Sequence, residues 1–167
     1  MRTASPLGRY DQATTDDALH EVRLIGVPVR VMVAGREHHD ELMREFALLA
    51  LSRSDIATVP TRLIELTQIL GVQYGGAAAR PDEEVDAALA RGDETIDLTY
   101  VVPAHVVDGA NTLSALMAEA DEFCRTEQLL TLARSSVLFD FAEWYIGEFR
   151  RQVAGEQPQP WTGPLDP

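Results

Sequence analysis

The order in which two hydrophobic periodicities follow each other limits the possible folds of this chain more than any other feature. Two segments alternate along the chain with a period of two, "VRLIGVPVRVMVAG" at residues 22–35 and "ETIDLTYVVP" at residues 94–103. Such alternation predicts half-buried strands. Because Pro28 cannot donate a ladder hydrogen bond, the first strand is expected at a sheet edge or as two short strands around Gly26. Its valine face would consist of Val27, Val29, Val31 and Val33.

Apolar residues at helical spacing fill most of the remaining chain. A periodic stripe, together with Pro near a helix start and Gly near its end, predicts each helix and its limits. The predicted helices run from about residue 37 to Ser52, from Thr58 to the glycine pair at 75 and 76, from Pro81 to Gly92, from Pro103 through Phe123, and from a cap at Ser135 or Ser136 to about residue 154.

A third strand is predicted at residues 129–133, "LLTLA", and the continuation of a helix through these five residues is the alternative. Helices between strands favour crossover connections, and a small sheet with one polar face favours two layers. The sequence therefore predicts a single α/β domain at residues 22–154, a two-layer sandwich in which helices cover one face of a small three- to four-stranded sheet. Residues 1–21 are predicted to be a flexible N-terminal arm and residues 155–167 a Pro-rich C-terminal tail.

Composition limits the compartment and the class of partner. A chain of 167 residues with 46% hydrophobic residues can bury one core without cross-links. Its single cysteine, Cys124, excludes an intramolecular disulfide, and neither a signal peptide nor an apolar span is visible, so a cytoplasmic protein is expected. The formal net charge of -13 gives no basic surface for phosphates, so neither nucleic acid nor membrane is a predicted partner.

Five ionisable residues stand together in "GREHHDEL", residues 35–42. Adjacent histidines point about 100° apart on a helix, so only pairs such as His38 with Glu41, or Glu37 with Glu41, could share a metal ion. Carboxylates in a first helical turn interact favourably with the helix dipole, so the favoured prediction is that Glu37, Asp40 and Glu41 lie in that turn and that one of them caps the helix. Metal or acid/base chemistry and a contact to a partner through His38 or His39 are the alternatives.

The familiar catalytic motifs are absent: the chain has no G-x-S-x-G, no Walker loop and no G-x-G-x-x-G. Cys124 has no partner motif beside it and is expected to be a buried packing residue. No catalytic residue and no cofactor is therefore predicted.

Aromatic residues concentrate near the C-terminal end. One helix face cannot bury all of them, which leaves two alternatives. Either the tail folds back so that Trp161 covers Trp144, or an aromatic patch remains for a partner, which includes a second copy of the chain. The predicted interaction residues are His38, His39, Phe139, Trp144 and Trp161.

Four phrases carry a resemblance to a known group of proteins: "VRLIGVPVRVMVAGREHHDELMREFALLAL", "RGDETIDLTYVVP", "ADEFCRTEQLLTLA" and "FAEWYIGEFRRQVAGEQPQPW". Over most of residues 22–161 the chain resembles a group of small, largely uncharacterised actinobacterial proteins. That group is associated with anti-sigma kinases, STAS-domain antagonists and SpoIIE-type phosphatases of partner-switching regulation. The resemblance implies a regulatory interaction with a protein such as an anti-sigma or STAS-type regulator, and it supplies no catalytic residue.

Two functions remain as hypotheses from the sequence. The preferred one is a non-enzymatic cytoplasmic regulatory or adaptor protein that acts through protein–protein interaction, in line with the resemblance. The alternative is a small-molecule or metal-binding protein, or an enzyme, that uses the cluster from Glu37 to Glu41. An ATP site like that of the anti-sigma kinases is not expected, because the only asparagine, Asn111, lies outside the second predicted helix.

Overall fold

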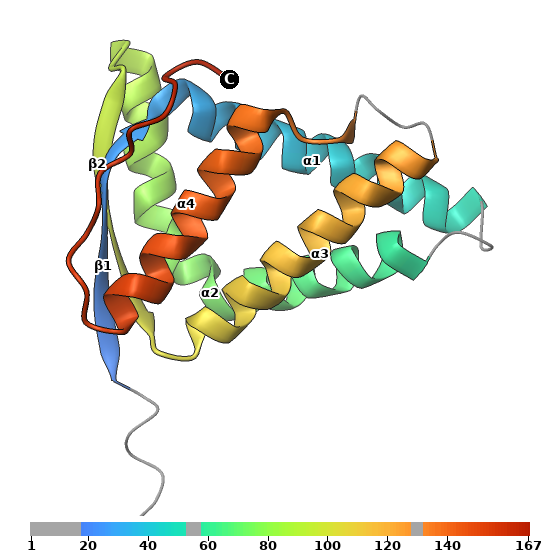
Figure 1. Ribbon diagram of the computed structural model, residues 1–167, viewed down its shortest axis with the longest axis horizontal. Helices are drawn as coiled ribbons and strands as arrows, with labels where there is room; N and C mark the ends of the chain where they lie inside the picture. The colour runs from blue at the N-terminus through green and yellow to red at the C-terminus, as the bar shows by residue number, and fades with distance from the viewer. Residues whose placement is uncertain (1–17, 53–57, 128–131) are drawn as a thin grey trace, which may run out of the picture.

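The computed structural model describes residues 18–52, 58–127 and 132–167, which form two strands and four helices (Figure 1). In chain order the elements are β1 (Leu19–Pro28), α1 (Val29–Ser52), α2 (Thr58–Arg91), β2 (Thr95–Pro103), α3 (Val106–Thr126) and α4 (Ser136–Val153). β1 begins at Leu19, inside the segment assigned to the N-terminal arm, and residues 1–17 lie outside the described part.

The two strands pair antiparallel, with Leu19 opposite Pro103 at one end and Pro28 opposite Thr95 at the other. A bulge interrupts the register between Leu24 and Val27, where Gly26 adopts a left-handed φ of +69° and its N–H donates to the Asp97 carboxylate at 2.8 Å. One face of the sheet is buried and the other is exposed, which confirms the predicted half-buried strand at residues 95–103. Figure 1 shows the helices on one side of the sheet.

The first predicted strand is correct only up to Pro28. α1 begins at Val29, so Val29, Val31 and Val33 belong to a helix and not to a strand face. Val29 and Val31 are both fully buried because the first turn of α1 enters the core directly beneath the sheet. Valine disfavours a helix by only about half a kcal/mol. Burial of Val29 and Val31 therefore decides that this segment is helical. The alternation of valines in the sequence does not reflect a strand.

The predicted break at Gly75 and Gly76 is also wrong, because α2 is continuous through both glycines and through Pro81. Glycine costs a helix about 1 kcal/mol relative to alanine, which packing can offset. Pro81 is fully packed in the core. In Figure 1 the first part of α2 lies along α3, whereas its last part rises beside the sheet. This one helix therefore packs against both α3 and β2.

The described residues contain a two-stranded sheet, where three or four strands were predicted. Most of the third predicted strand, residues 129–131, lies outside the described part, and Leu132 and Ala133 are not in a strand. The broad α/β class fits, but helices dominate, and the predicted sandwich on a larger sheet is not seen in the described part.

Buried side chains form two clusters. The first, beneath the sheet, includes Val22, Leu24, Leu98, Tyr100 and Phe149, and Trp144 and Trp161 pack against it. The second lies among α1, α2 and α3, away from the sheet, and consists of Leu42, Phe46, Leu63, Leu116, Ala120 and Cys124. The two clusters leave room between them, where the helices diverge.

The outer edge of β1 is covered by α4 and by the C-terminal tail. The Gln152 side chain accepts from the Arg23 N–H and donates to the Arg23 carbonyl, both at 2.8 Å, as a neighbouring strand would. Two residues along, the Trp161 N–H donates to the Ile25 carbonyl at 3.0 Å. The Glu148 carboxylate is fully buried and accepts from Gln152 and from the backbone N–H of Gln159.

The tail folds back, as the first of the two sequence alternatives proposed. The Trp161 ring lies edge-on against Trp144 and Phe141, each at a centroid distance of 5.5 Å. The indole N–H of Trp144 donates to the Gln159 carbonyl at 3.1 Å. Most of the C-terminal aromatic side chains therefore pack against one another inside the molecule.

Candidate ligand-binding site

A cleft of about 420 Å³ opens among α1, α3 and α4, between the two buried clusters. We refer to it as the α1/α3/α4 cleft. Its wall is mainly apolar, and its polar residues come mostly from the "GREHHDEL" stretch. The apolar lining consists of Met32, Gly35, Leu113, Met117, Leu138, Phe141, Ala142, Tyr145 and Ile146, and the polar lining of Arg36, His38, His39, Asp40, Ser114 and Arg134.

The capping role predicted for the acidic residues of that stretch is wrong. Because α1 begins at Val29, residues Glu37, Asp40 and Glu41 lie in the helix interior, and the first turn of α1 contains no acidic residue. All three are exposed. The neighbouring histidines instead face the molecule and line the cleft.

His38 and His39 are held in their neutral form. Burial lowers the pKa of His38 below its usual value, opposed by the Asp121 carboxylate and reinforced by Arg134. Burial also lowers the pKa of His39, against a smaller opposite effect of Asp40. The Nε2 atom of His38 is buried and has no hydrogen-bond partner among the described residues. At neutral pH the cleft therefore presents two uncharged imidazoles.

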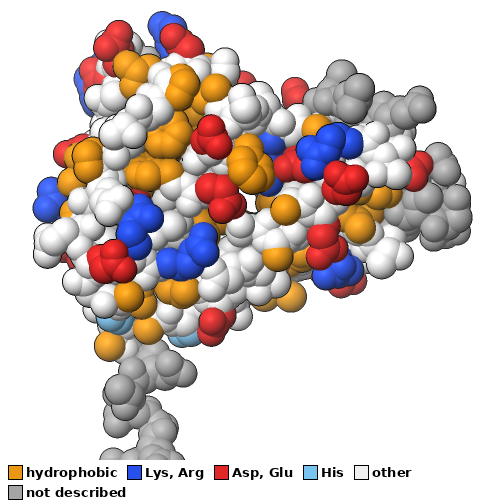
Figure 2. Space-filling model, in the orientation of Figure 1, with side chains coloured by type: hydrophobic (Ala, Val, Ile, Leu, Met, Phe, Trp, Pro, Cys, Tyr) orange, Lys and Arg blue, Asp and Glu red, His pale blue; other side chains and the backbone are white. Residues whose placement is uncertain are grey.

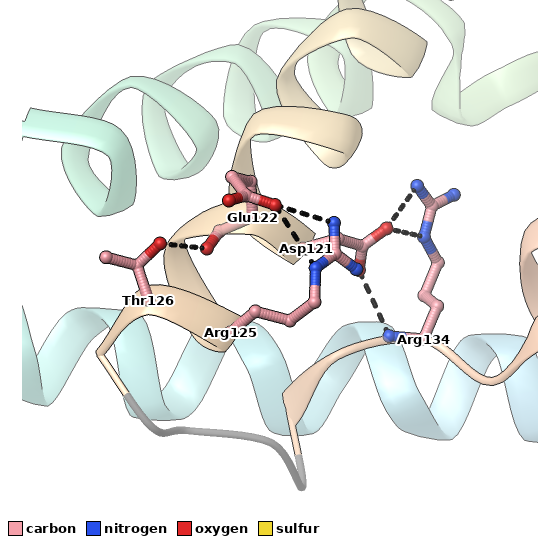
Figure 3. Close-up of polar contacts among 5 residues, drawn as sticks. All are labelled: Asp121, Glu122, Arg125, Thr126 and Arg134. Atoms are coloured by element: carbon pink, nitrogen blue, oxygen red, sulfur yellow. Dashed lines mark hydrogen bonds and ion pairs between the residues drawn. The ribbon is translucent and has the colours of Figure 1, made fainter.

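An ion pair of low exposure joins the end of α3 to the start of α4 (Figure 3). Asp121 accepts from the Arg134 backbone N–H at 3.0 Å and from Nε at 2.8 Å, and both side chains are only 6% exposed. Its neighbour, the Glu122–Arg125 pair, lies in solvent. Arg134 lines the cleft with its charge already neutralised by Asp121.

The other polar groups of the wall also have partners. Arg36 forms ion pairs with Asp86 at 3.2 Å and Asp82 at 3.6 Å, both on α2. The hydroxyl of Ser114 donates to the Glu143 carboxylate at 2.8 Å. The serine is thus not paired with an imidazole, and both arginines already form ion pairs with carboxylates.

A second, smaller pocket of about 190 Å³ adjoins the cleft and shares Leu113, Tyr145 and Ile146 with it. The rings of Tyr100 and Tyr145 lie edge-on to each other there, at a centroid distance of 6.0 Å, and burial raises the pKa of Tyr100 to about 12 and that of Tyr145 well above its usual value. Both phenols therefore stay protonated. The space beyond the cleft is apolar and uncharged.

Metal binding has no support in the geometry. In residues 18–52, 58–127 and 132–167, no three His, Cys, Asp or Glu side chains come together to hold an ion, so His38 and Glu41 are not part of such a cluster. Cys124 is buried in the second cluster, and burial raises its pKa to about 11, so it is a packed thiol and not a thiolate.

The structure divides the predicted interaction residues between two places. His38 and His39 line the cleft, and Trp144 and Trp161 belong to the aromatic packing under the tail. Phe139 is 41% exposed, with the Arg134 guanidinium 5.1 Å above its ring. Sequence reasoning missed Leu113, Met117 and Ala142 as cleft residues. The small side chains at 35 and 142 are the one available signal, since small residues where helices face each other leave space.

Comparisons of the chain with family models, curated proteins and solved structures give no match in any of the three. Within the described residues, every helix is too short or too polar to serve as a membrane span.

Proposed function

We propose that the chain is a non-enzymatic protein that binds one small, mostly apolar molecule in the α1/α3/α4 cleft. The cleft itself is the observation that carries this proposal. Its volume of about 420 Å³ falls within the range of roughly 300–1,000 Å³ typical of small-molecule sites, and a mainly apolar wall with a few convergent polar groups is the usual composition of such sites. Imidazoles with shifted pKa values at its wall add support.

Binding is favoured over catalysis because the serine and both arginines of the wall are already engaged. The Ser114 hydroxyl donates to Glu143 and not to a histidine, which leaves no activated nucleophile. The arginines are held by Asp82, Asp86 and Asp121 and are not directed at a developing negative charge. The setting we propose is the cytoplasm, consistent with a single, buried cysteine.

Filling the cleft from within tests the proposal. Gly35 lines the cleft, and a Cβ there would meet only Leu138, at 3.9 Å. A Gly35→Leu variant should occupy the cleft while strengthening α1, because leucine favours a helix over glycine by roughly 1 kcal/mol. We expect small apolar molecules to raise the melting temperature of the wild type and to have at least tenfold weaker affinity for Gly35→Leu.

Gly75→Leu is the matched control. Gly75 is an exposed helical glycine of α2 with no neighbouring atom within 4 Å, so the same substitution there gains the same helix propensity outside the cleft. Ala142→Leu tests the opposite wall. The proposal is wrong if calorimetry shows equal ligand binding by the wild type and both cleft variants.

The regulatory or adaptor role implied by the resemblance is a second candidate. Exposed apolar side chains on α2 favour it: Ile69 is 52% and Val72 is 89% exposed, and both border a shallow depression lined by Glu65, Gln68 and Gln73. Ile69 and Val72 are three residues apart, so they share one face of the helix and form a small contiguous apolar surface for a partner. The partner would be an anti-sigma or STAS-type regulator, or a second copy of the chain.

An Ile69→Ser, Val72→Ser double variant separates the two roles. If α2 binds a partner, the variant should lose the complex in sedimentation experiments and keep its ligand binding in the cleft. A complex that survives the double substitution would remove the support for this surface.

A further inference from the structure

We propose that the ligand of the α1/α3/α4 cleft is electrically neutral, with an apolar body and a hydroxyl or carbonyl group directed at the imidazoles of His38 and His39. This inference rests on the proposed function and adds the chemical class of the molecule. It follows from what each polar group at the wall can still do.

An anionic ligand finds both arginines of the described wall already paired with carboxylates. Arg36 already has two carboxylates, Asp82 and Asp86, so the group around it carries an excess of negative charge. Arg134 is committed to Asp121 through an ion pair whose two side chains are each only 6% exposed. Taking Arg134 from Asp121 would leave a carboxylate of only 6% exposure unpaired, and a poorly solvated unpaired charge costs several kcal/mol.

A cationic ligand finds no carboxylate inside. Asp40 is the only acidic residue of the lining, and it is exposed, so its negative charge is already hydrated. Asp121 is held by Arg134, and Glu143 accepts from Ser114. A cation in the cleft would give up its hydration without a dedicated partner in return.

The imidazoles are the polar groups that remain for a ligand. His38 has a buried Nε2 atom without a partner, and a neutral imidazole has one donor and one acceptor nitrogen. A hydroxyl can both donate and accept, so it matches either tautomer. The neighbouring small pocket beyond Leu113, Tyr145 and Ile146 is apolar, which gives the body of the molecule a continuous apolar surface.

The experiment uses three probes of the same length and shape that differ in charge: 1-octanol, octanoate and octylammonium. Their binding to the wild-type chain at neutral pH is measured by calorimetry, with Gly35→Leu to identify binding in the cleft and Gly75→Leu as the control. We expect 1-octanol to bind at least tenfold more tightly than either ion, and we expect Gly35→Leu to weaken that binding at least tenfold.

A His38→Leu, His39→Leu variant tests the polar contact. We expect this variant to bind 1-octanol roughly three- to tenfold more weakly than the wild type, which corresponds to the loss of one hydrogen bond of typical net strength. Binding of either ion with an affinity within tenfold of that of 1-octanol, or tighter, overturns the assignment of a neutral ligand and leaves the proposed function intact. If none of the three probes shows binding that depends on Gly35, the proposed function fails, and this inference fails with it.

Discussion

Asp121 and Arg134 form the ion pair that fixes the start of α4 against α3. Asp121 receives both the guanidinium and the backbone N–H of Arg134, so a single carboxylate positions the residue that precedes the Ser135 cap of α4. The two charges of this pair also act on the pKa of His38, which Asp121 raises and Arg134 lowers. A change at Asp121 therefore affects the fold and the cleft together.

Removing one partner of this pair should cost much more than removing both. We expect Asp121→Leu or Arg134→Leu alone to lower the free energy of unfolding by about 3–5 kcal/mol, because the remaining charge stays buried without its partner. The double variant should recover most of this loss, since an apolar pair of similar volume is often neutral. Urea unfolding of the four proteins measures the coupling.

The exposed pair in the same region is the control for that cycle (Figure 3). Glu122 and Arg125 interact at 3.1 Å, but their side chains are 70% and 53% exposed. Their replacement should change the free energy of unfolding by less than about 1 kcal/mol. Losses that simply add for Asp121 and Arg134 would contradict the expected coupling.

The histidines of the cleft should make stability depend on pH. Because the folded state lowers the pKa of His38 and His39, it binds fewer protons than the unfolded state near the usual histidine pKa of about 6.5. Their contribution is fully present above about pH 6.5 and is lost as pH falls from there toward the folded pKa. Denaturant unfolding at several pH values between about 5 and 8 should show stability that rises with pH.

A His38→Gln, His39→Gln variant should have a shallower dependence of stability on pH across that range. Its control is His20→Gln, which removes a histidine from β1, away from the cleft. An unchanged slope in the double variant would show that other groups cause the dependence.

At the scale of elements, the outer edge of β1 depends on α4. Gln152 takes the place of a third strand at Arg23, and the buried Glu148 carboxylate holds the Gln152 amide in position. An uncovered strand edge is a template for pairing with other chains. The two-stranded sheet is therefore completed by a side chain and a tail segment.

A Gln152→Ala variant should be less stable by about 2–4 kcal/mol, because the Arg23 backbone groups and the Glu148 carboxylate each lose a partner. It should also self-associate at high concentration, which analytical ultracentrifugation detects. Arg150→Ala, an exposed change in the same last turn of α4, is the control and should leave both properties unchanged. A fully monomeric and stable Gln152→Ala protein would show that the edge needs no such cover.

The elements that the sequence predicted well are those whose signals are local. The alternation from Thr95 to Val102 and the cap at Ser135 both depend on near neighbours, and both are found in the structure. The junction at Pro28 and the continuity of α2 through Gly75 depend instead on tertiary packing. Tertiary packing outweighed the propensity costs of valine and glycine, about 1 kcal/mol or less per residue, and the cost of about 3 kcal/mol for Pro81 inside α2.

At the scale of the whole molecule, the candidate site could be predicted only in part. The sequence pointed to the "GREHHDEL" stretch, whose histidines line the cleft, but it placed the carboxylates at a helix start and did not assign the histidines to a cleft. The cleft exists because three helices diverge between two packed clusters. No short-range pattern encodes how Leu113 or Ala142 faces His38, because those residues lie far apart in the chain.

The cover of β1 also has a consequence for synthesis. Arg23 and Gln152 are separated by 129 positions, so the ribosome makes the strand long before the side chain that pairs with its outer edge. During most of translation, the nascent chain carries a strand whose edge is open. An open strand edge is a template for pairing with other chains, so the growing chain is open to aggregation in the interval before Gln152 is made.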